Sequence, residues 1–311
     1  MIVFLLLLAG LWIPGRAQDP PSRTPVPTPP GETLAAEADA YAGSETCSLC
    51  HEDIARAFQQ NAHFSVDNGR SKKIQAKAWA SRACESCHGP GKAHAEAGDG
   101  KQIFVFTSAA GARANQQCLA CHAGDATHSG RLMGSHNRNQ LACTNCHSIH
   151  HPTARRLLAA APNALCQSCH LEVGAEFQRP YRHKLQERAI TCADCHNPHG
   201  GLPPHDQRRA AANEVICLKC HGDKRGPFPF EHAPVRLTSC STCHEPHGSA
   251  NPRMLTRHDQ SLLCLECHTT TPGFAGATPP AFHDLRSARF RNCTICHSKI
   301  HGSYISRDLL R

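Results

Sequence analysis

The sequence predicts a mostly irregular, elongated array of five repeats, built from short α-helices with little or no β-structure. Large apolar side chains are scarce, because aromatic residues make up only 5% of the 311 residues while Gly and Pro contribute 22 each. The chain is instead rich in Cys and His, with 20 and 24 of them, and the cysteines recur at a repeating spacing. With so few large apolar side chains, the chain cannot form a packed core large enough to offset the entropy of ordering it. We therefore expect something other than side chains to supply the interior.

Composition divides the chain into three regions. An apolar run at residues 2–13 is followed by the small residues Gly15 and Ala17, the pattern of an export signal that is cleaved after residue 17. We expect a signal peptide over 1–17, a Pro-rich disordered linker over 18–42, and a folded region over 43–311 that holds every cysteine. No apolar run approaches the ~20 residues that span a bilayer, so we expect no transmembrane segment.

All 20 cysteines lie in ten Cys-x-x-Cys pairs, and each second cysteine is followed at once by a histidine. Cys-x-x-Cys-His is the attachment signature of c-type haem. Two thiols three residues apart lie on one side of a helical turn, where they can form thioethers with the macrocycle, and the next imidazole points at the iron. The predicted thioether cysteines are Cys47, Cys50, Cys84, Cys87, Cys118, Cys121, Cys143, Cys146, Cys166, Cys169, Cys192, Cys195, Cys217, Cys220, Cys240, Cys243, Cys264, Cys267, Cys293 and Cys296. The predicted proximal iron ligands are His51, His88, His122, His147, His170, His196, His221, His244, His268 and His297.

Three other interpretations of paired cysteines leave these histidines unexplained. Zinc sites use pairs of such pairs and give no reason for a histidine at the next position. A disulfide framework would suit an exported chain with an even number of cysteines, but it does not need histidine either. A thioredoxin-like redox pair occurs once in a domain rather than ten times. Ten motifs without a stray cysteine therefore favour ten haem c groups.

Ten further histidines follow the motifs at regular distances and are the predicted distal iron ligands. Counted from the amino terminus, odd motifs are followed by a histidine 11 to 15 residues beyond the proximal one, and even motifs by one 3 to 6 residues beyond it. The odd set is His63, His136, His183, His232 and His283, and the even set is His94, His150, His199, His247 and His301. The leftover histidines, expected at the surface or near haem propionates, are His128, His151, His205 and His258. Ligation by Met133 or Met254 is a minor alternative.

The order of odd motif, histidine, even motif and histidine recurs five times. Successive odd motifs are separated by 71, 48, 51 and 47 residues, a period typical of an array of one supersecondary unit. We expect units at about 43–114, 115–162, 163–212, 213–258 and 259–311, with an insertion in the first unit between residues 64 and 83. A helix-capping residue precedes each odd motif, and these residues are Ser44, Asn115, Asn163, Asn213 and Asp259.

The spacing of the distal histidines also suggests which haem each of them serves. A histidine three residues after a proximal ligand lies on the same side of that macrocycle, so His150, His199 and His247 should reach a neighbouring haem and staple units together. The longer spacing of the odd set is sufficient to loop around a macrocycle, so we expect these histidines to serve their own haems. The Pro-His-Gly sequences at 198–200 and 246–248 fit close approach to a ring, because Gly removes a side chain.

Two imidazoles for every iron leave no open position for a substrate, which favours an electron carrier over an enzyme. The alternatives are a multihaem reductase of a small oxyanion or nitrogen compound, which needs one open iron, and a soluble periplasmic electron shuttle. The net charge of +8 does not indicate nucleic-acid binding, because the basic residues are scattered and no aromatic platform accompanies them. They fit a role as counter-charges to haem propionates.

Several longer motifs resemble the MtrA/DmsE family of decahaem c-type cytochromes, and the match extends over roughly 43–307. They are CESCHGPG at 84–91, DCHNPHG at 194–200, GPFPFEH at 226–232, CHEPHGS at 243–249 and IHGS at 300–303. The resemblance implies a periplasmic electron conduit, often inside an outer-membrane β-barrel. Such a conduit connects periplasmic donors, including quinol-linked cytochromes, with an extracellular cytochrome, reductase or other acceptor. Tyr304 departs from the Asn of the family and points to a different partner surface.

Overall fold

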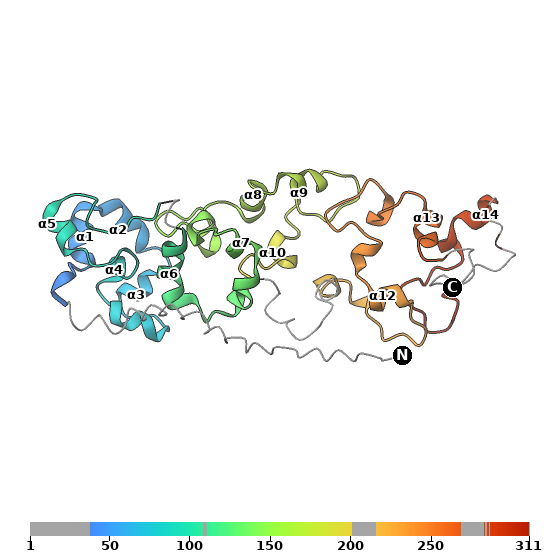
Figure 1. Cartoon of the computed structure of the whole chain (residues 1–311), viewed down its shortest axis with the longest axis horizontal. Coiled ribbons are helices and arrows are strands. Elements are labelled where there is room, and N and C mark those ends of the chain that lie inside the picture. The colour runs from blue at the N-terminus through green and yellow to red at the C-terminus, as the bar shows by residue number, and fades with distance from the viewer. Residues whose placement is uncertain are drawn as a thin grey trace, which may run out of the picture.

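The computed structural model describes residues 38–107, 111–200, 216–268, 283, 285 and 287–310. These residues form an elongated molecule along which the chain advances, so that helix α1 (Ser44–Cys50) and helix α14 (Ala288–Arg291) lie near opposite ends (Figure 1). Within this described part there is no β-strand, only isolated bridges. The predicted fold class of short helices in a mostly irregular, elongated array is confirmed. The predicted signal peptide lies outside the described residues.

The helices are short, and the longest α-helix of the described part, α6, has 12 residues. The remaining α-helices are α2 (Glu52–Phe58), α3 (Phe64–Asp67), α4 (Ala83–His88), α5 (Lys92–Ala97), α6 (Gly111–His122), α7 (Ser135–Arg138), α8 (Pro162–Gln167), α9 (Leu171–Glu176), α10 (Cys192–Cys195), α12 (Ala233–Leu237) and α13 (Gln260–Leu265). The 3₁₀-helices are η1 (Ala38–Ala40), η2 (Ile74–Trp79), η4 (Ala126–His128), η5 (Arg131–Met133), η6 (Cys143–Asn145), η7 (Arg155–Leu157), η8 (Gly222–Lys224), η9 (Cys240–Thr242), η10 (Pro252–Met254) and η11 (Cys293–Ile295). None of these described helices is both long and apolar enough to cross a membrane.

Each motif forms a single helical turn. In η6, for example, the amide of His147 donates to the carbonyl of Cys143 at 2.9 Å, and His51 bonds Cys47 in α1 in the same way at 3.0 Å. This bond between the motif histidine and the first motif cysteine places the two cysteine side chains on one side of the turn, as the three-residue spacing predicts. The local structure therefore leaves both thiols and the imidazole directed to one side.

The residues expected to cap the helices have a different role in three of the four described cases. Asn115 lies inside α6, and its Oδ1 accepts a hydrogen bond from the amide of Cys143 at 2.7 Å. Asn163 bonds the amide of Cys192 in the same way at 3.2 Å. Ser44 begins α1 and donates to Asp67 at 2.6 Å. Asparagine offers both a donor and an acceptor, so it ties the odd helix to the even motif of its own unit.

Asp259 is the one described residue of this group that caps its helix. Its carboxylate accepts from the amide of Ser261 at 2.8 Å, at the start of α13. Asn213 lies outside the described residues.

Side chains form almost no core. Among the described residues the buried apolar side chains are Ala76, Ala83, Ala114, Ala142, Phe177, Leu185 and Leu255. Large apolar side chains such as Leu49 and Ile74 are 80% exposed. The molecule instead encloses a continuous cavity of about 4900 Å³, lined by residues from Tyr41 to Leu310. Ordinary ligand pockets measure about 300–1,000 Å³, so this cavity has room for a series of cofactors.

The ordered part of the chain includes residues 38–42, which the sequence analysis placed in the disordered linker. The carboxylate of Glu85 is 1% exposed and accepts hydrogen bonds from the amides of Ala42 at 2.8 Å and Gly43 at 3.0 Å. It also accepts from the amide of Gly91 at 2.8 Å. A buried carboxylate needs such partners, so the second motif holds the start of the folded region in place. The earlier part of the predicted linker lies outside the described residues.

The predicted insertion of the first unit, residues 64–83, contains α3 and η2. It contacts the second unit through Lys73, whose ammonium donates to the carbonyl of Cys121 at 2.9 Å and to Asp125 at 2.5 Å. The insertion therefore packs against the third motif rather than projecting from the array.

Two short bridges connect successive predicted units. Tyr181 and Ser249 exchange backbone hydrogen bonds of 3.2 and 2.8 Å, and Phe230 and Ser303 do the same at 3.1 and 2.8 Å. In each case the first residue stands two positions before an odd-set histidine, and the second follows a His-Gly pair of the next unit. These bridges bring an odd-set and an even-set histidine together at the junction.

The glycines of the His-Gly pairs allow this close approach. A Cβ atom on Gly200 would lie 2.3 Å from the carbonyl oxygen of Ser129, and one on Gly248 would lie 2.4 Å from that of Glu176. The sequence suggested that these glycines approach a ring. The structure shows that at both positions the nearest atom of the described chain is a backbone carbonyl oxygen of the preceding unit, so glycine is required for contact between units.

Candidate haem-binding site

The first cysteines of the two motifs in each unit contact one another. The thiol of Cys47 donates to Cys84, which raises the pKa of Cys47 and lowers the pKa of Cys84 to about 6. The corresponding contacts in the five units are Cys47–Cys84, Cys118–Cys143, Cys166–Cys192, Cys217–Cys240 and Cys264–Cys293. Two motifs of one unit thus meet through their first sulfur atoms.

The second cysteines lie close enough across the unit junctions for their charges to interact. Burial raises the pKa of Cys87, and the neighbouring Cys121 of the next unit raises it further. The same relation holds for four pairs, Cys87–Cys121, Cys146–Cys169, Cys195–Cys220 and Cys243–Cys267. Together with the pairs inside the units, these neighbouring cysteines follow the ten motifs in chain order, alternating between first and second cysteines.

Every predicted distal histidine has its ring opposite that of one motif histidine. The centres of the paired rings are 5.8 to 6.2 Å apart. The pairs are His51–His94, His88–His150, His122–His63, His147–His199, His170–His136, His196–His247, His221–His183, His244–His301, His268–His232 and His297–His283.

This separation fits a metal ion between the two rings. A metal–imidazole nitrogen bond measures about 2 Å, so two bonds in line place the ring centres roughly 6 Å apart. The two thiols of the motif stand beside each pair on the same helical turn. The residues present therefore fit a c-type haem whose iron has an imidazole on each face.

His150, His199 and His247 each face a motif histidine of the preceding unit. The structure thus places these three rings across a unit junction, where the sequence expected them to act as staples. His94 faces the odd motif of its own unit, and His301 faces the even motif of the preceding one.

The expectation that the odd set returns to its own motifs is wrong. His63 faces His122 of the next unit, and the following three members of the set likewise face the next odd motif. His283 faces His297, the even motif of its own unit. The reason lies in the segment between them, because helices α2 and α9 begin directly after His51 and His170 and carry the chain away from the motif.

The Nδ1 atoms of many paired imidazoles are held by backbone carbonyls. His183 bonds the carbonyl of Pro246 at 2.8 Å, and His147 bonds that of Arg156 at 2.9 Å. Seven paired histidines have such a partner at Nδ1, and they are His88, His94, His136, His147, His183, His244 and His297. An eighth, His232, has a backbone hydrogen bond with Ile300. A hydrogen bond at Nδ1 fixes the tautomer and leaves Nε2 as the free metal-binding atom.

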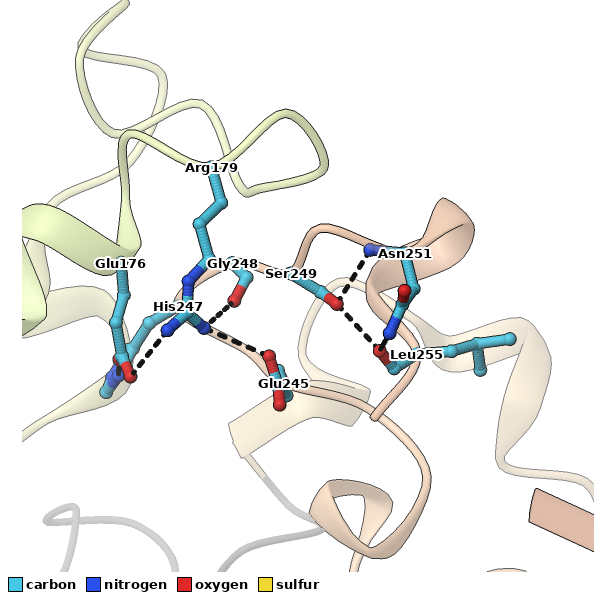
Figure 2. A network of polar contacts seen from close by, with 8 residues as sticks. All are labelled: Glu176, Arg179, Glu245, His247, Gly248, Ser249, Asn251 and Leu255. Atoms are coloured by element: carbon cyan, nitrogen blue, oxygen red, sulfur yellow. Dashed lines mark hydrogen bonds and ion pairs between the residues drawn. The ribbon is translucent and has the colours of Figure 1, made fainter. Parts of the chain in front are cut away.

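Two paired imidazoles bond carboxylates instead. His122 Nδ1 lies 2.6 Å from Asp125 Oδ2, and His247 Nδ1 lies 3.0 Å from Glu176 Oε2 (Figure 2). Lys73 and His122 together lower the pKa of Asp125 to about 2. The sequence analysis did not find these acidic residues. The three-residue spacing from His122 to Asp125 could have indicated one of them, but Glu176 and His247 are 71 residues apart.

The leftover histidines do not share one environment. His258 is exposed, as expected, and His205 lies outside the described residues. His128 is half-buried, and its ring centre lies 4.6 Å from that of His199. Burial first, and then His128, lower the pKa of His199 to about 4. A neutral imidazole is the form that binds a metal.

The comparisons with known proteins agree with this geometry. The doubled CXXCH motif family matches residues 135–175, 183–226 and 232–273. Multiheme cytochrome MtrA of Shewanella baltica (strain OS185) is 34% identical over 276 residues, which cover 84% of this chain and 78% of that protein. The chain belongs to the MtrA family of multihaem c-type cytochromes. The predictions that this MtrA-family chain binds haem c and transports electrons are thereby confirmed.

A second relative matches a shorter part of the MtrA-family chain. Cytochrome c-type protein NrfB of Escherichia coli O6:H1 is 27% identical over 140 residues, which cover 39% of this chain and 72% of that protein. It is similar over fewer motifs, in agreement with an array built by repetition of one unit.

Proposed function

We propose that this chain holds ten haems c and conducts electrons along its length, between periplasmic donors and an outer-membrane or extracellular acceptor. When bound, each haem supplies an iron that takes up and releases one electron. The observation that carries the proposal is the unbroken series of neighbouring, electrostatically interacting cysteines from Cys47 to Cys293.

In this proposal each motif attaches one haem through its two cysteines, and each facing histidine pair supplies the two axial ligands of one iron. The ring separation near 6 Å supports this assignment at all ten pairs, and the carbonyl partners at Nδ1 support it at seven. Eight of the ten pairs join two of the predicted units, so the ligands also hold the array together.

In this proposal the neighbouring cysteines bring successive haems near one another. A thioether sulfur would attach at the edge of its macrocycle, so two neighbouring sulfurs would bring two macrocycle edges close together. Within a unit the first cysteines do this, for example Cys166 with Cys192, and between units the second cysteines do it, for example Cys146 with Cys169. Because the two cysteines of a motif lie on one helical turn, each inner motif has a cysteine neighbour on both sides, and the series continues through all five units.

The paired histidines also favour a carrier over an enzyme. A reductase needs one iron with an open position, whereas every motif histidine here faces a second imidazole. We therefore expect the oxidised protein to show low-spin ferric signals alone, with ten haems per chain by the pyridine haemochrome assay. A high-spin ferric signal would assign an open iron and support reduction of a small oxyanion or nitrogen compound.

The elongated shape (Figure 1) fits a conduit through an outer-membrane β-barrel, the arrangement that the family resemblance implies. A long, narrow array with a motif near each end can accept an electron on one side of a barrier and release it on the other. Co-purification from outer-membrane extracts with a β-barrel protein tests this assignment. Recovery of the protein only from the soluble periplasmic fraction would favour the electron shuttle.

A further inference from the structure

Two of the ten facing histidine pairs differ from the others in the hydrogen-bond partner of one imidazole, which is a carboxylate. His122 and His247 bond carboxylates through Nδ1, whereas seven paired histidines bond backbone carbonyls. Glu172 is a third acidic side chain beside a paired imidazole, but it stays 3.9 Å from His170 Nδ1, beyond hydrogen-bond distance. The difference is therefore specific to the pairs His122–His63 and His196–His247.

Asp125 is held between a cation and the imidazole. Its Oδ1 accepts from the Lys73 ammonium at 2.5 Å, while its Oδ2 faces His122 Nδ1 at 2.6 Å. Lys73 also donates to the carbonyl of Cys121, so its position is fixed by the motif itself. The carboxylate is therefore oriented toward the ring by a residue of the preceding unit.

The other ring of this pair has no compensating partner. His63 Nδ1 is buried and has no hydrogen-bond partner among the described residues. The carbonyl of Ile149, which precedes His150 as Pro198 precedes His199, is bonded by the Asn61 side chain at 2.8 Å. In this pair, therefore, only His122 receives electron density through a hydrogen bond to a carboxylate.

Glu176 acts across a unit junction. Its Oε2 faces His247 Nδ1 at 3.0 Å (Figure 2), and the adjacent Arg179 is 3.7 Å from its Oε1. Arg179 directs its shorter bonds elsewhere, to Glu245 at 3.0 Å and to the carbonyl of Gly248 at 2.8 Å (Figure 2). Glu176 is thus less fully neutralised than Asp125.

A carboxylate that accepts the Nδ1–H bond makes the imidazole a stronger donor at Nε2 than a carbonyl does. A stronger donor stabilises the oxidised iron, and hydrogen bonding around the ligands is one of the factors by which a protein sets the reduction potential. We propose that Asp125 and Glu176 lower the reduction potentials of the haems held by His122–His63 and His196–His247 below those of their neighbours. This inference rests on the proposed function, in which these pairs ligate haem iron.

The consequence is an uneven potential profile along the conduit. The two affected positions are the third and the sixth motifs, in the second and third units, so neither end of the array contains one. Transfer of an electron onto either of these haems is energetically uphill. The two carboxylates therefore limit the rate of transfer through the middle of the chain.

Variants that should shift the reduction potential in opposite directions test the inference. Asp125→Asn removes the charge but keeps the size, and should raise the potential of one haem. Lys73→Met removes the cation that neutralises Asp125, and should lower the potential of the same haem. Glu176→Gln should raise the potential of a different haem. Glu187→Gln is the matched control, because Glu187 is an exposed carboxylate paired with Arg182 at 3.3 Å and bonds no imidazole of the described residues.

Redox titrations followed by optical and electron paramagnetic resonance spectra supply the readout. The ring planes of His63 and His122 are 73° apart, the widest angle of the ten pairs. Imidazole planes that approach the perpendicular give low-spin ferric haem a more anisotropic resonance than parallel planes do. The Asp125 and Lys73 variants should therefore shift the titration of this one signal, and the Glu176 variant should leave it in place.

The inference is overturned if the Asp125, Lys73 and Glu176 variants titrate like Glu187→Gln while the haem content stays unchanged. If Asp125→Asn loses a haem, Lys73→Met and Glu176→Gln decide the question. Lys73 bonds no side chain of a motif directly, and Glu176 bonds His247, which lies outside the motifs. Failure of the proposed function is distinguishable from this result. It would appear in the unsubstituted protein as fewer than ten haems or as a high-spin signal.

Discussion

Replacing Cys166 and Cys169 by alanine should leave nine haems on the chain and divide the conduit into two halves. Cys166 contacts Cys192 within its unit, and Cys169 lies beside Cys146 of the preceding unit. Loss of both thiols therefore removes the haem that lies between the two neighbouring motifs in our proposal. The fifth motif is also central in the array, so its loss opens a gap as wide as one macrocycle between four motifs on one side and five on the other.

A light-activated electron donor attached at one end tests whether electrons cross this gap. Ile305, which is 77% exposed near the carboxyl terminus, can be replaced by cysteine to carry a photosensitiser. After a flash, electrons should spread rapidly over only the five haems on the dye side of the gap. Replacement of Cys47 and Cys50 is the matched control, because it also removes one haem but leaves nine contiguous carriers. Rapid reduction of all nine haems in the central variant would show that transfer does not follow the cysteine contacts.

Replacing Gly248 by alanine should separate the third and fourth units. The new Cβ atom would lie 2.4 Å from the carbonyl oxygen of Glu176, and the backbone φ of Gly248 is +152°, which non-glycine residues rarely adopt. Backbone strain and overpacking each cost about 1–3 kcal/mol, so we expect a total of about 2–6 kcal/mol. The displacement also moves His247 away from His196, its partner ring at 6.0 Å.

Thermal unfolding of the haem-loaded protein measures this cost, and a decrease of the midpoint by about 5 °C or more is expected. Gly222→Ala is the matched control, because a Cβ atom there would meet nothing within 4 Å. Its midpoint should stay close to that of the unsubstituted protein. Equal midpoints for the two variants would show that the glycine contact does not hold the units together.

The sequence was sufficient to predict the fold class and the motifs, because both depend on short-range spacing. A cysteine pair followed by histidine requires one helical turn, and the structure provides that turn at His147 and His51. The scarcity of large apolar side chains likewise predicted a molecule with little side-chain core. Repetition of the unit indicated an elongated array, and Figure 1 shows one.

The pairing of the histidines could not be predicted in full, because it depends on the direction in which the chain leaves each motif. The distance from His51 to His63 is long enough to loop back, but α2 occupies most of that segment and leads it onward to His122. Short-range geometry was more informative for His199 and His247, because a ligand one turn away cannot reach the opposite face of its own macrocycle.

Side-chain hydrogen bonds between distant segments were also beyond prediction. Asn115 has the residue type and position of a helix cap, but the nearby amide of Cys143 provides a stronger constraint on its side chain. Glu176 and His247 meet only because the units stack in a particular register, which no local pattern contains.

The positions of the iron atoms in the haem-loaded protein test the central claim most directly. Anomalous scattering at the iron absorption edge would locate each iron within a crystal of the full chain. The account predicts ten peaks, one between the rings of each facing histidine pair, in the chain order of their motifs. Fewer peaks, or an iron that lies outside a facing pair, would contradict it.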